Sequence, residues 1–173
     1  DSTTFRVTDA AGVLAVNVPL TNNFPGTGGG ANGLTKTGSG TLTITAASTY
    51  TGATQVNEGT LVMGDATSDT FTTSGVTVAS GATLGGSGTI SGGTVTLNAE
   101  SSPGAKDGGT LAPGNSIGTL TVNNLNFNTN SIFEWEMDYA GSTRGTQYDA
   151  VKVTSSSTAP GGAISRLGLA GAS

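Results

Sequence analysis

Short apolar runs alternate with polar residues along most of this chain and predict β-strands. Leu42-Thr43-Ile44, Leu61-Val62-Met63 and Leu120-Thr121-Val122 are examples. Such runs turn every second side chain toward a core, which is the period of a strand with one buried face. Turn-forming residues separate the runs, as at Asn57-Glu58-Gly59 and Pro113-Gly114-Asn115. We therefore expect an all-β chain of short strands that end at corners.

Helices and hairpins explain this pattern less well. Gly interrupts the helical spacing of apolar residues everywhere before the last dozen residues, so that only Ala163 to Ala172 allows a helix. Hairpins usually join strands of about five or six residues through two-residue turns. The runs here are shorter, and their corners are irregular and rich in Gly. A parallel coil is therefore favoured over an antiparallel sandwich.

A short phrase, Gly-Thr-Leu or Gly-Thr-Ile, recurs along the chain. Its copies are Gly40-Thr41-Leu42, Gly59-Thr60-Leu61, Gly88-Thr89-Ile90, Gly109-Thr110-Leu111 and Gly118-Thr119-Leu120. A looser copy lies at Gly81-Ala82-Thr83-Leu84. Successive copies often lie about two dozen residues apart, with extra copies between them, and this period is typical of a solenoid.

The fold expected from the repeat is a right-handed parallel β-helix. Because stacked strands lie about 4.8 Å apart, turns of this length predict seven or so turns and a rod roughly 35 Å long. We expect one β-helical domain over residues 1–153, with N-terminal coils over 1–29 and repeat-like sequence over 30–153. Residues 154–173 are expected to form a terminal coil or an extended segment. Neither end shows a charged or helical cap.

The core is expected to be thin, because only 34% of the residues are hydrophobic. Each core side chain contributes about 1.5 to 3 kcal/mol when it is fully buried. The predicted members are Leu42, Ile44, Val56, Leu61, Val76, Val78, Leu84, Ile90, Val95, Leu97, Leu111, Leu120, Val122, Leu125 and Phe127.

Composition and charge exclude several classes of function. The net charge is −5, and the cations are scattered over Arg6, Lys36, Lys106, Arg144, Lys152 and Arg166. Scattered cations favour neither nucleic acid nor anionic membrane surfaces. The absence of Cys and His removes disulfides, thiol nucleophiles, the usual zinc sites and the best proton-transfer group near neutral pH. No stretch approaches the roughly 20 apolar residues of a spanning helix, and the sequence does not start with a signal-peptide pattern.

Several longer segments resemble a known repeat family. Gly33 to Ile44 has the sequence GLTKTGSGTLTI, and Thr49 to Leu61 has the sequence TYTGATQVNEGTL. Together they closely resemble the autotransporter-associated β-strand repeat, which typically has the form GLTKTGxGTLxLxGxNTYTGxTxVxxGTL. Leu111 to Val122, LAPGNSIGTLTV, is similar to the LxPGNSxGTLTV segment near the end of such repeat regions. Ile132 to Tyr139 and Tyr148 to Val153 fit the strand and the YDxLxV segment that often follow.

The resemblance covers roughly residues 30 to 153 and implies a secreted or surface-displayed bacterial β-helix. Such a β-helix is often the passenger or stalk of a larger protein. The sequence contains one complete copy of the long repeat and does not contain the translocating β-barrel of autotransporters. A fold of this kind indicates architecture far better than activity.

The stretch from Phe133 to Tyr139 alternates large apolar and acidic residues. Glu134, Glu136 and Asp138 share one face of the expected strand, about 6.6 to 7 Å apart. Carboxylates roughly 6.5 to 9.5 Å apart suit inverting glycoside hydrolysis, and carboxylate oxygens also bind Ca²⁺. We favour the simpler interpretation, in which the apolar members pack over the core near the end of the rod and the acids face water.

Gly28, Gly30 and Gly33 match the G-x-G-x-x-G outline of a dinucleotide-binding turn. That turn needs a buried strand before it and a helix after it, whose N-terminus receives the pyrophosphate. Here Phe24-Pro25-Gly26 precedes the glycines and a β-rich run follows. We therefore interpret them as a flexible corner.

Asp65, Asp69 and Asp107 lie in corners that lack a calcium-loop motif, and we interpret them as turn caps. Four aromatic side chains that we expect to be exposed are candidates for stacking on sugar rings. They are Tyr50, Trp135, Tyr139 and Tyr148, although scattered packing is the simpler role. No catalytic, cofactor-binding or metal-binding residue is predicted.

The expected function is structural and not enzymatic. We expect a rigid extracellular rod of a bacterial surface protein, fibre or matrix that self-associates through its open ends. One alternative is an adhesin that grips a glycan or another cell-surface partner with the side of the rod. A second is a polysaccharide-active enzyme, for which the chain offers few charges. The expected location is the cell surface or the extracellular space.

Overall fold

The computed structural model describes residues 2–22, 30–114, 116–137, 147–158 and 167–170. Every helix or strand within these ranges is a β-strand. The strands are β1 (Ser2–Arg6), β2 (Val13–Val16), β3 (Gly33–Thr37), β4 (Thr41–Ile44), β5 (Thr54–Val56), β6 (Thr60–Met63), β7 (Thr70–Phe71), β8 (Val76–Val78), β9 (Thr83–Gly86), β10 (Thr89–Leu97), β11 (Thr110–Pro113), β12 (Thr119–Phe127), β13 (Ile132–Glu136), β14 (Ala150–Thr158) and β15 (Leu167–Ala170).

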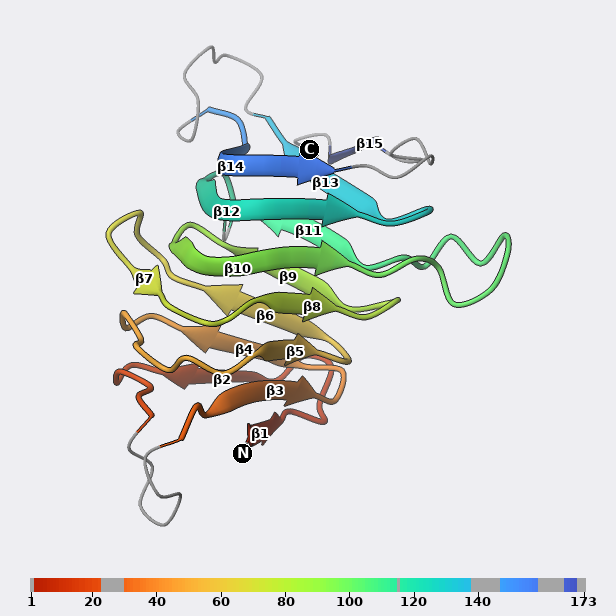
Figure 1. Cartoon of the computed structure of the whole chain (residues 1–173). Coiled ribbons are helices and arrows are strands. Elements are labelled where there is room, and N and C mark those ends of the chain that lie inside the picture. Colours follow the sequence, from red (N-terminus) through yellow and green to blue (C-terminus); the bar gives the residue numbers. More distant parts are fainter. Residues whose placement is uncertain (1, 23–29, 115, 138–146, 159–166, 171–173) are drawn as a thin grey trace.

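The strands form two parallel sheets, and the chain crosses repeatedly between them (Figure 1). One sheet has the order β1-β3-β5-β8-β10-β12-β14, with β7 paired to β10 beside this path, and the other has the order β15-β13-β11-β9-β6-β4-β2. Parallel neighbours cannot be joined by a tight hairpin, so each strand reaches its neighbour through the opposite sheet. The architecture is a parallel β-helix, which confirms the expected fold class. The second sheet is 7-stranded, which agrees with the seven or so turns expected from the repeat.

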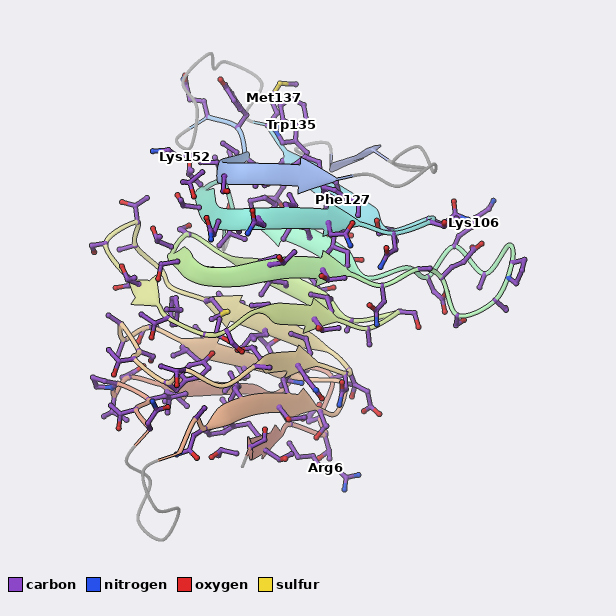
Figure 2. The ribbon with its side chains drawn as sticks, viewed as in Figure 1. Arg6, Lys106, Phe127, Trp135, Met137 and Lys152 are labelled. Atoms are coloured by element: carbon purple, nitrogen blue, oxygen red, sulfur yellow. The ribbon has the colours of Figure 1, made fainter. Side chains whose placement is uncertain are left out.

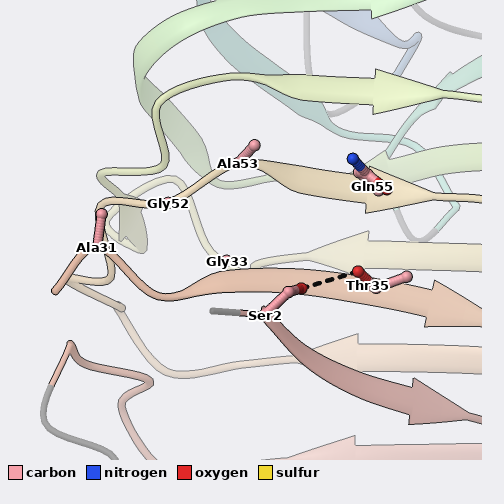
Figure 3. Close-up of a pocket in the computed structure, with 7 residues that line it drawn as sticks. All are labelled: Ser2, Ala31, Gly33, Thr35, Gly52, Ala53 and Gln55. Carbon is pink, nitrogen blue, oxygen red and sulfur yellow. Dashed lines mark hydrogen bonds between the residues drawn. The ribbon is translucent and has the colours of Figure 1, made fainter. Parts of the chain in front are cut away.

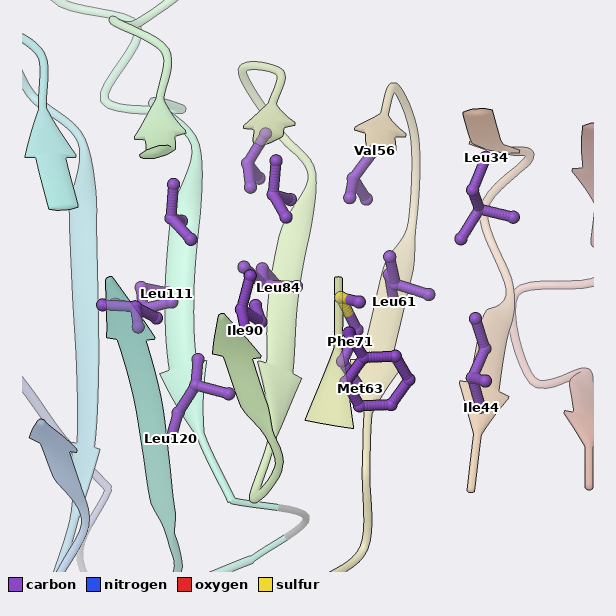
Figure 4. Close-up of a cluster of buried hydrophobic side chains, with 14 of the residues drawn as sticks. Leu34, Ile44, Val56, Leu61, Met63, Phe71, Leu84, Ile90, Leu111 and Leu120 are labelled. Carbon is purple, nitrogen blue, oxygen red and sulfur yellow. The ribbon is translucent and has the colours of Figure 1, made fainter. Parts of the chain in front are cut away.

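The recurring Gly-Thr-Leu phrase places a leucine at one register position in successive rungs. Leu42 pairs with Leu61, Leu61 with Leu84, and Leu84 with Leu111. All four side chains are fully buried, and Figure 4 shows three of them in the row of core side chains between the strands. Burial of one leucine contributes about 1.5 to 3 kcal/mol. Each copy of the phrase that continues this column therefore adds one buried leucine to the core and a similar amount of stability.

The predicted core is confirmed almost completely. Every predicted member is buried except Phe127, which is partly buried, packs against the core and meets the Phe133 ring edge-on at a centroid distance of 6.5 Å. The buried hydrophobic residues that sequence analysis missed are Leu20, Leu34, Tyr50, Val62, Met63, Phe71, Ala82 and Ala150. Leu20 and Tyr50 lie in corners outside the alternating runs, where the strand pattern gives no signal.

The long strands β10, β12 and β14 each bend around the coil. The register between β10 and β12 shifts between Ile90 and Thr94, and the register between β12 and β14 shifts between Val122 and Asn124. The first part of β10 pairs with β7, and its last part pairs with β8. Since β14 continues past residue 153, the predicted domain boundary falls within a strand, and the division of the chain there stays a prediction.

Candidate functional site

The acidic segment identified in the sequence forms β13 at the C-terminal end of the coil. Glu134 is exposed and Glu136 is partly buried. Phe133 packs against the core as expected, whereas the expectation that Met137 does the same is wrong, because Met137 is 45% exposed. Asp138 lies outside the described residues. Among the residues that the structure describes, no group of three acidic side chains is placed to hold a metal ion.

Asp149 joins β13 to the loop before β12. Its Oδ1 accepts a hydrogen bond from the Gly118 N–H at 2.9 Å, and its Oδ2 accepts one from the Glu136 N–H at 2.9 Å. The Asp149 carbonyl accepts a hydrogen bond from Trp135 Nε1 at 2.7 Å. Because Asp149 belongs to the YDAVKV segment and Gly118 to the PGNSIGTL segment, this carboxylate connects two of the family-like segments.

The environment of the Asp149 carboxyl group changes its acidity. Burial raises the pKa of Asp149, and the nearby Glu136 carboxylate raises it further. The two backbone N–H donors, from Glu136 and Gly118, act in the opposite direction because they stabilise the charged form. Both hydrogen bonds of the carboxylate are to backbone N–H groups of different segments, so Asp149 holds these segments together.

Lys36 occupies a core position of β3. In its register column it lies between Phe5 and Val56, and Val78 follows on the next strand. The side chain of Lys36 is fully buried. Sequence analysis treated Lys36 as one of the scattered cations, although its even spacing from Leu34 already places it on the inner face.

The Lys36 ammonium closes a corner of the coil. Its Nζ donates hydrogen bonds to the carbonyl oxygens of Gly38 at 2.6 Å, Thr37 at 3.0 Å and Glu58 at 3.1 Å. The Glu58 carboxylate accepts a hydrogen bond from the Gly38 N–H at 2.9 Å. Burial lowers the pKa of Lys36, and the charge of Glu58 opposes that change. An ammonium has three donors, and here each of them meets a backbone carbonyl.

Tyr50 is buried, so its expected exposure is wrong and it is no candidate for stacking on sugars; the packing role that the sequence favoured is the one observed. Only 2% of Tyr50 is exposed, and its hydroxyl lies 2.7 Å from Thr54 Oγ1. Thr54 donates to Thr73 Oγ1 at 3.0 Å, and Thr73 Oγ1 lies 2.8 Å from the Gly52 carbonyl. Burial raises the pKa of Tyr50 to about 12, against the effect of its threonine partners. Tyr50 thus anchors a line of hydroxyl groups inside the coil.

Two of the remaining aromatic candidates, Trp135 and Tyr148, lie near the C-terminal end of the coil. Trp135 and Tyr148 are partly buried and pack against each other at a centroid distance of 5.9 Å. Figure 2 shows Trp135 and Met137 together beyond β12, far from Arg6 at the other end. Tyr139 lies outside the described residues. This pair is the only candidate aromatic surface that the described residues retain.

The corner aspartates cap turns. Asp69 Oδ2 accepts hydrogen bonds from the N–H groups of Asp65 and Ala66, each at 3.2 Å. Asp107 accepts hydrogen bonds from the N–H of Ser101 at 2.8 Å and from its hydroxyl at 2.6 Å. These hydrogen bonds lower the pKa of Asp107. The contacts match the turn-cap interpretation for Asp69 and Asp107, whereas Asp65 takes part through its backbone N–H.

The loop between β10 and β11 projects from the side of the coil (Figure 1). Glu100 holds it by accepting hydrogen bonds from the Gly104 N–H at 3.1 Å, the Lys106 N–H at 2.9 Å and Asn130 Nδ2 at 2.6 Å. These donors lower the pKa of Glu100. Glu100 therefore serves the shape of the loop.

The glycine corner and a small pocket lie near the N-terminal end. Gly33 begins β3 and is followed by a strand, so the helix required by a dinucleotide turn does not follow it; Gly28 lies outside the described residues. Figure 3 shows a shallow pocket of about 200 Å³ on the outer face of β3 and β5. Its lining residues are short and uncharged: Ser2, Ala31, Gly33, Thr35, Gly52, Ala53 and Gln55. Such a lining offers no group for proton transfer.

The repeated phrase, the stacked rungs and the polar corners define a solenoid of the parallel β-helix class. Within it, residues 34–63 match the family model of the passenger-associated-transport-repeat, which confirms the resemblance seen in the sequence. The matched segment contains Lys36, Tyr50, Thr54 and Glu58, so it includes the polar side chains that form hydrogen bonds at these corners. No curated protein matches the chain.

The match implies an autotransporter passenger-associated protein, and a secreted or cell-surface location is consistent with it. Repeat family and fold together point to a non-catalytic repeat protein. No helix long and apolar enough to cross a membrane occurs in the part of the chain that the structure describes.

Replacement of Lys36 tests whether the corner depends on its ammonium. Lys36→Met keeps an inward apolar stem but removes the ammonium donor from the carbonyls of Gly38 and Glu58, while the Thr37 carbonyl keeps its hydrogen bond from the Val7 N–H. We therefore expect the free energy of unfolding to fall by about 1 to 3 kcal/mol. Urea denaturation measures it. Lys152→Met, which changes an exposed lysine of β14, is the control and should change stability by about 0.5 kcal/mol or less. Unchanged stability of Lys36→Met would show that desolvation of the ammonium cancels its hydrogen bonds.

The raised pKa of Asp149 predicts a particular pH dependence. Because the folded state holds this proton more tightly than the unfolded state, the Asp149 contribution is full below about pH 4 and decreases as the pH rises through the folded pKa. The difference in unfolding free energy between the unchanged protein and Asp149→Asn should therefore decrease from about pH 4 to 7.

Urea denaturation across this range measures the difference, and the carboxylates common to both proteins cancel from it. Glu134→Gln, on the exposed face of β13, is the control and should show no such trend. A difference that increases with pH would contradict the assignment.

Proposed function

We propose that this chain is a rigid extracellular rod of a bacterial surface protein, fibre or matrix, with a structural or display role. The observation that carries the proposal is the unbroken column of buried leucines, which makes each rung depend on its neighbours. In a solenoid each repeat contacts only its neighbours, so the stack extends along one axis. A spacer or display element needs that property.

The use of ionisable groups supports the same proposal. Lys36 and Asp149, both buried, bind backbone groups at corners, and Glu100 and Asp107 hold one loop. Catalytic sites instead gather titratable groups around a space for substrate. These four charged side chains serve the shape of the coil.

The loop between β10 and β11 offers a position for display. It leaves the stack, and its shape is held by contacts of Glu100 and Asp107. Loops fixed on a rigid scaffold are common carriers of binding function. Insertions there leave the rungs untouched, which suits a rod that presents segments to its surroundings.

An adhesin that binds glycans is the second candidate. The Trp135 and Tyr148 pair favours it, because both rings are partly exposed at one end of the coil. Aromatic side chains with polar handles stack on sugar rings. Because Tyr50 is buried, it provides no aromatic surface for sugars in the middle of the coil.

Two assays on the purified chain separate these functions. On a panel of neutral and acidic polysaccharides, the structural role predicts no release of sugar, and on a glycan array it predicts no signal above background. Sugar release that Glu134→Gln abolishes would replace the proposal with an enzyme. Array binding that Tyr148→Ala abolishes, but Phe5→Ala at the opposite end does not, would replace it with an adhesin.

A further inference from the structure

The outer face of the sheet that contains β3, β5, β8 and β10 has a column of polar side chains. Thr35 pairs in register with Gln55, Gln55 with Thr77, and Thr77 with Thr96. Gln55 and Thr77 are exposed, and the two other side chains are partly buried. No register shift interrupts these pairings, so the four side chains form one continuous column across the strands. We call this column the polar ridge.

A trough runs beside the polar ridge. Gly33 begins β3, Ala53 and Gly75 directly precede β5 and β8, and each lies two residues before a ridge residue, on the same outer face. A Cβ atom added to Gly33 would lie 2.6 Å from the Ala53 carbonyl oxygen, so strand packing keeps a side chain out of this position. The pocket of about 200 Å³ in Figure 3, whose lining includes Gly33, Thr35, Ala53 and Gln55, is part of this trough.

The face formed by the ridge and the trough is uncharged. The one charged residue within β3, β5, β8 and β10 is Lys36, which is buried inside the coil. The chain as a whole has a net charge of −5, so two copies repel each other wherever their acidic side chains meet. The outer face of the other sheet contains such an acid, the exposed Glu134 of β13. The ridge face lets two copies meet without opposing charges.

The ridge and the trough complement each other under one particular symmetry. A two-fold axis that is parallel to the coil axis and lies between the two columns sets the ridge of each copy opposite the trough of the other. Gln55 then lies opposite Ala53 of the second copy, between the levels of Gly33 and Gly75. The same axis places the two copies of Glu58, which follows β5 at a corner, on opposite sides of the contact. A two-fold axis along the strands instead sets ridge against ridge and brings both Glu58 corners to one side.

We propose that two copies of this chain associate side by side with their coils parallel, through the polar ridge and the trough. The inference rests on the proposed structural role and names the partner of the rod as a second copy of the same chain. Such a contact is isologous and closes as a dimer. Hydroxyl and amide groups of the ridge supply both donors and acceptors to the facing copy.

The size of the face sets the strength of the association. Four strands with five residues each cover roughly 19 Å by 17 Å. This area is less than half of the about 800 Å² per partner of a standard interface. The dimer therefore forms in proportion to protein concentration, and a fibre or matrix that crowds many copies favours it.

Sedimentation equilibrium over a rising protein concentration tests the association. The unchanged chain should shift from monomer toward dimer. Thr77→Glu buries an unpaired carboxylate in the contact and should raise the dissociation constant at least tenfold. Thr43→Glu adds the same charge to a partly buried threonine on the outer face of β4, in the other sheet, and should leave the dissociation constant unchanged. Circular dichroism melts establish that both variants are folded.

Chemical cross-linking tests the parallel arrangement, because the chain has no Cys of its own. Thr35→Cys and Thr96→Cys place single thiols on the ridge three strand spacings apart, roughly 14 Å along the coil. In the parallel dimer each thiol lies level with its own counterpart, so a short bis-maleimide should link homodimers of each variant. In an equal mixture, with one variant tagged, homodimers should exceed mixed dimers several-fold. Thr43→Cys is the control and should give no dimers.

Three results would overturn the proposal. Mixed dimers in excess would show antiparallel pairing, equal yields from Thr43→Cys would show contact without a preferred face, and a monomer at every concentration would show no pairing. A chain that stays monomeric, binds no glycan and releases no sugar would overturn the association and leave the structural role intact.

Discussion

A leucine in this coil is kept from water only when the rung on each side covers it. Leu42, Leu61, Leu84 and Leu111 satisfy this condition and are fully buried, whereas Leu14 in the first rung does not and is exposed. The constraint explains why the chain repeats its phrase, because a rung with a different register would expose two neighbours.

Corners impose the second constraint, since backbone groups turned into the coil need hydrogen-bond partners. Lys36 supplies three donors to one corner. At a second corner, the hydroxyl groups of Tyr50, Thr54 and Thr73 form a line of hydrogen bonds. Asp149 supplies acceptors to two N–H groups near the C-terminal end. The residues that make the repeat recognisable therefore include polar groups. Their hydrogen bonds lower the free-energy cost of burying backbone groups at a turn of the coil.

The sequence predicted the architecture well because the two-residue alternation of a strand and the recurring phrase follow directly from how strands are buried and stacked. Alternation in runs such as Leu42-Thr43-Ile44 fixed the inner face of each strand, and the recurring phrase fixed the parallel class. The corners were predicted poorly. Tyr50 was expected at the surface because aromatic residues with hydroxyl groups suit both environments, and only the placement of Thr54 and Thr73 decides between them.

The position of Lys36 was equally hard to predict, because its pattern and its charge point to opposite sides of the strand. Its parity with Leu34 indicates an inward side chain, but the cost of burying an ammonium argues for the surface unless carbonyl partners are known. Those partners belong to a neighbouring rung and corner, at Glu58 and Gly38, which no local pattern reveals. The bends within β10 and β12 likewise depend on contacts between rungs.

The central claim is that consecutive rungs stack in parallel with a fixed register. Intramolecular disulfide formation tests it most directly, in the double variant Thr35→Cys with Gln55→Cys, whose positions are register partners on β3 and β5. The account predicts rapid closure of this pair and no closure for Thr35→Cys with Thr77→Cys, which lie two rungs apart. Failure of the first pair to close, or equal closure of both, would contradict the stacked parallel coil.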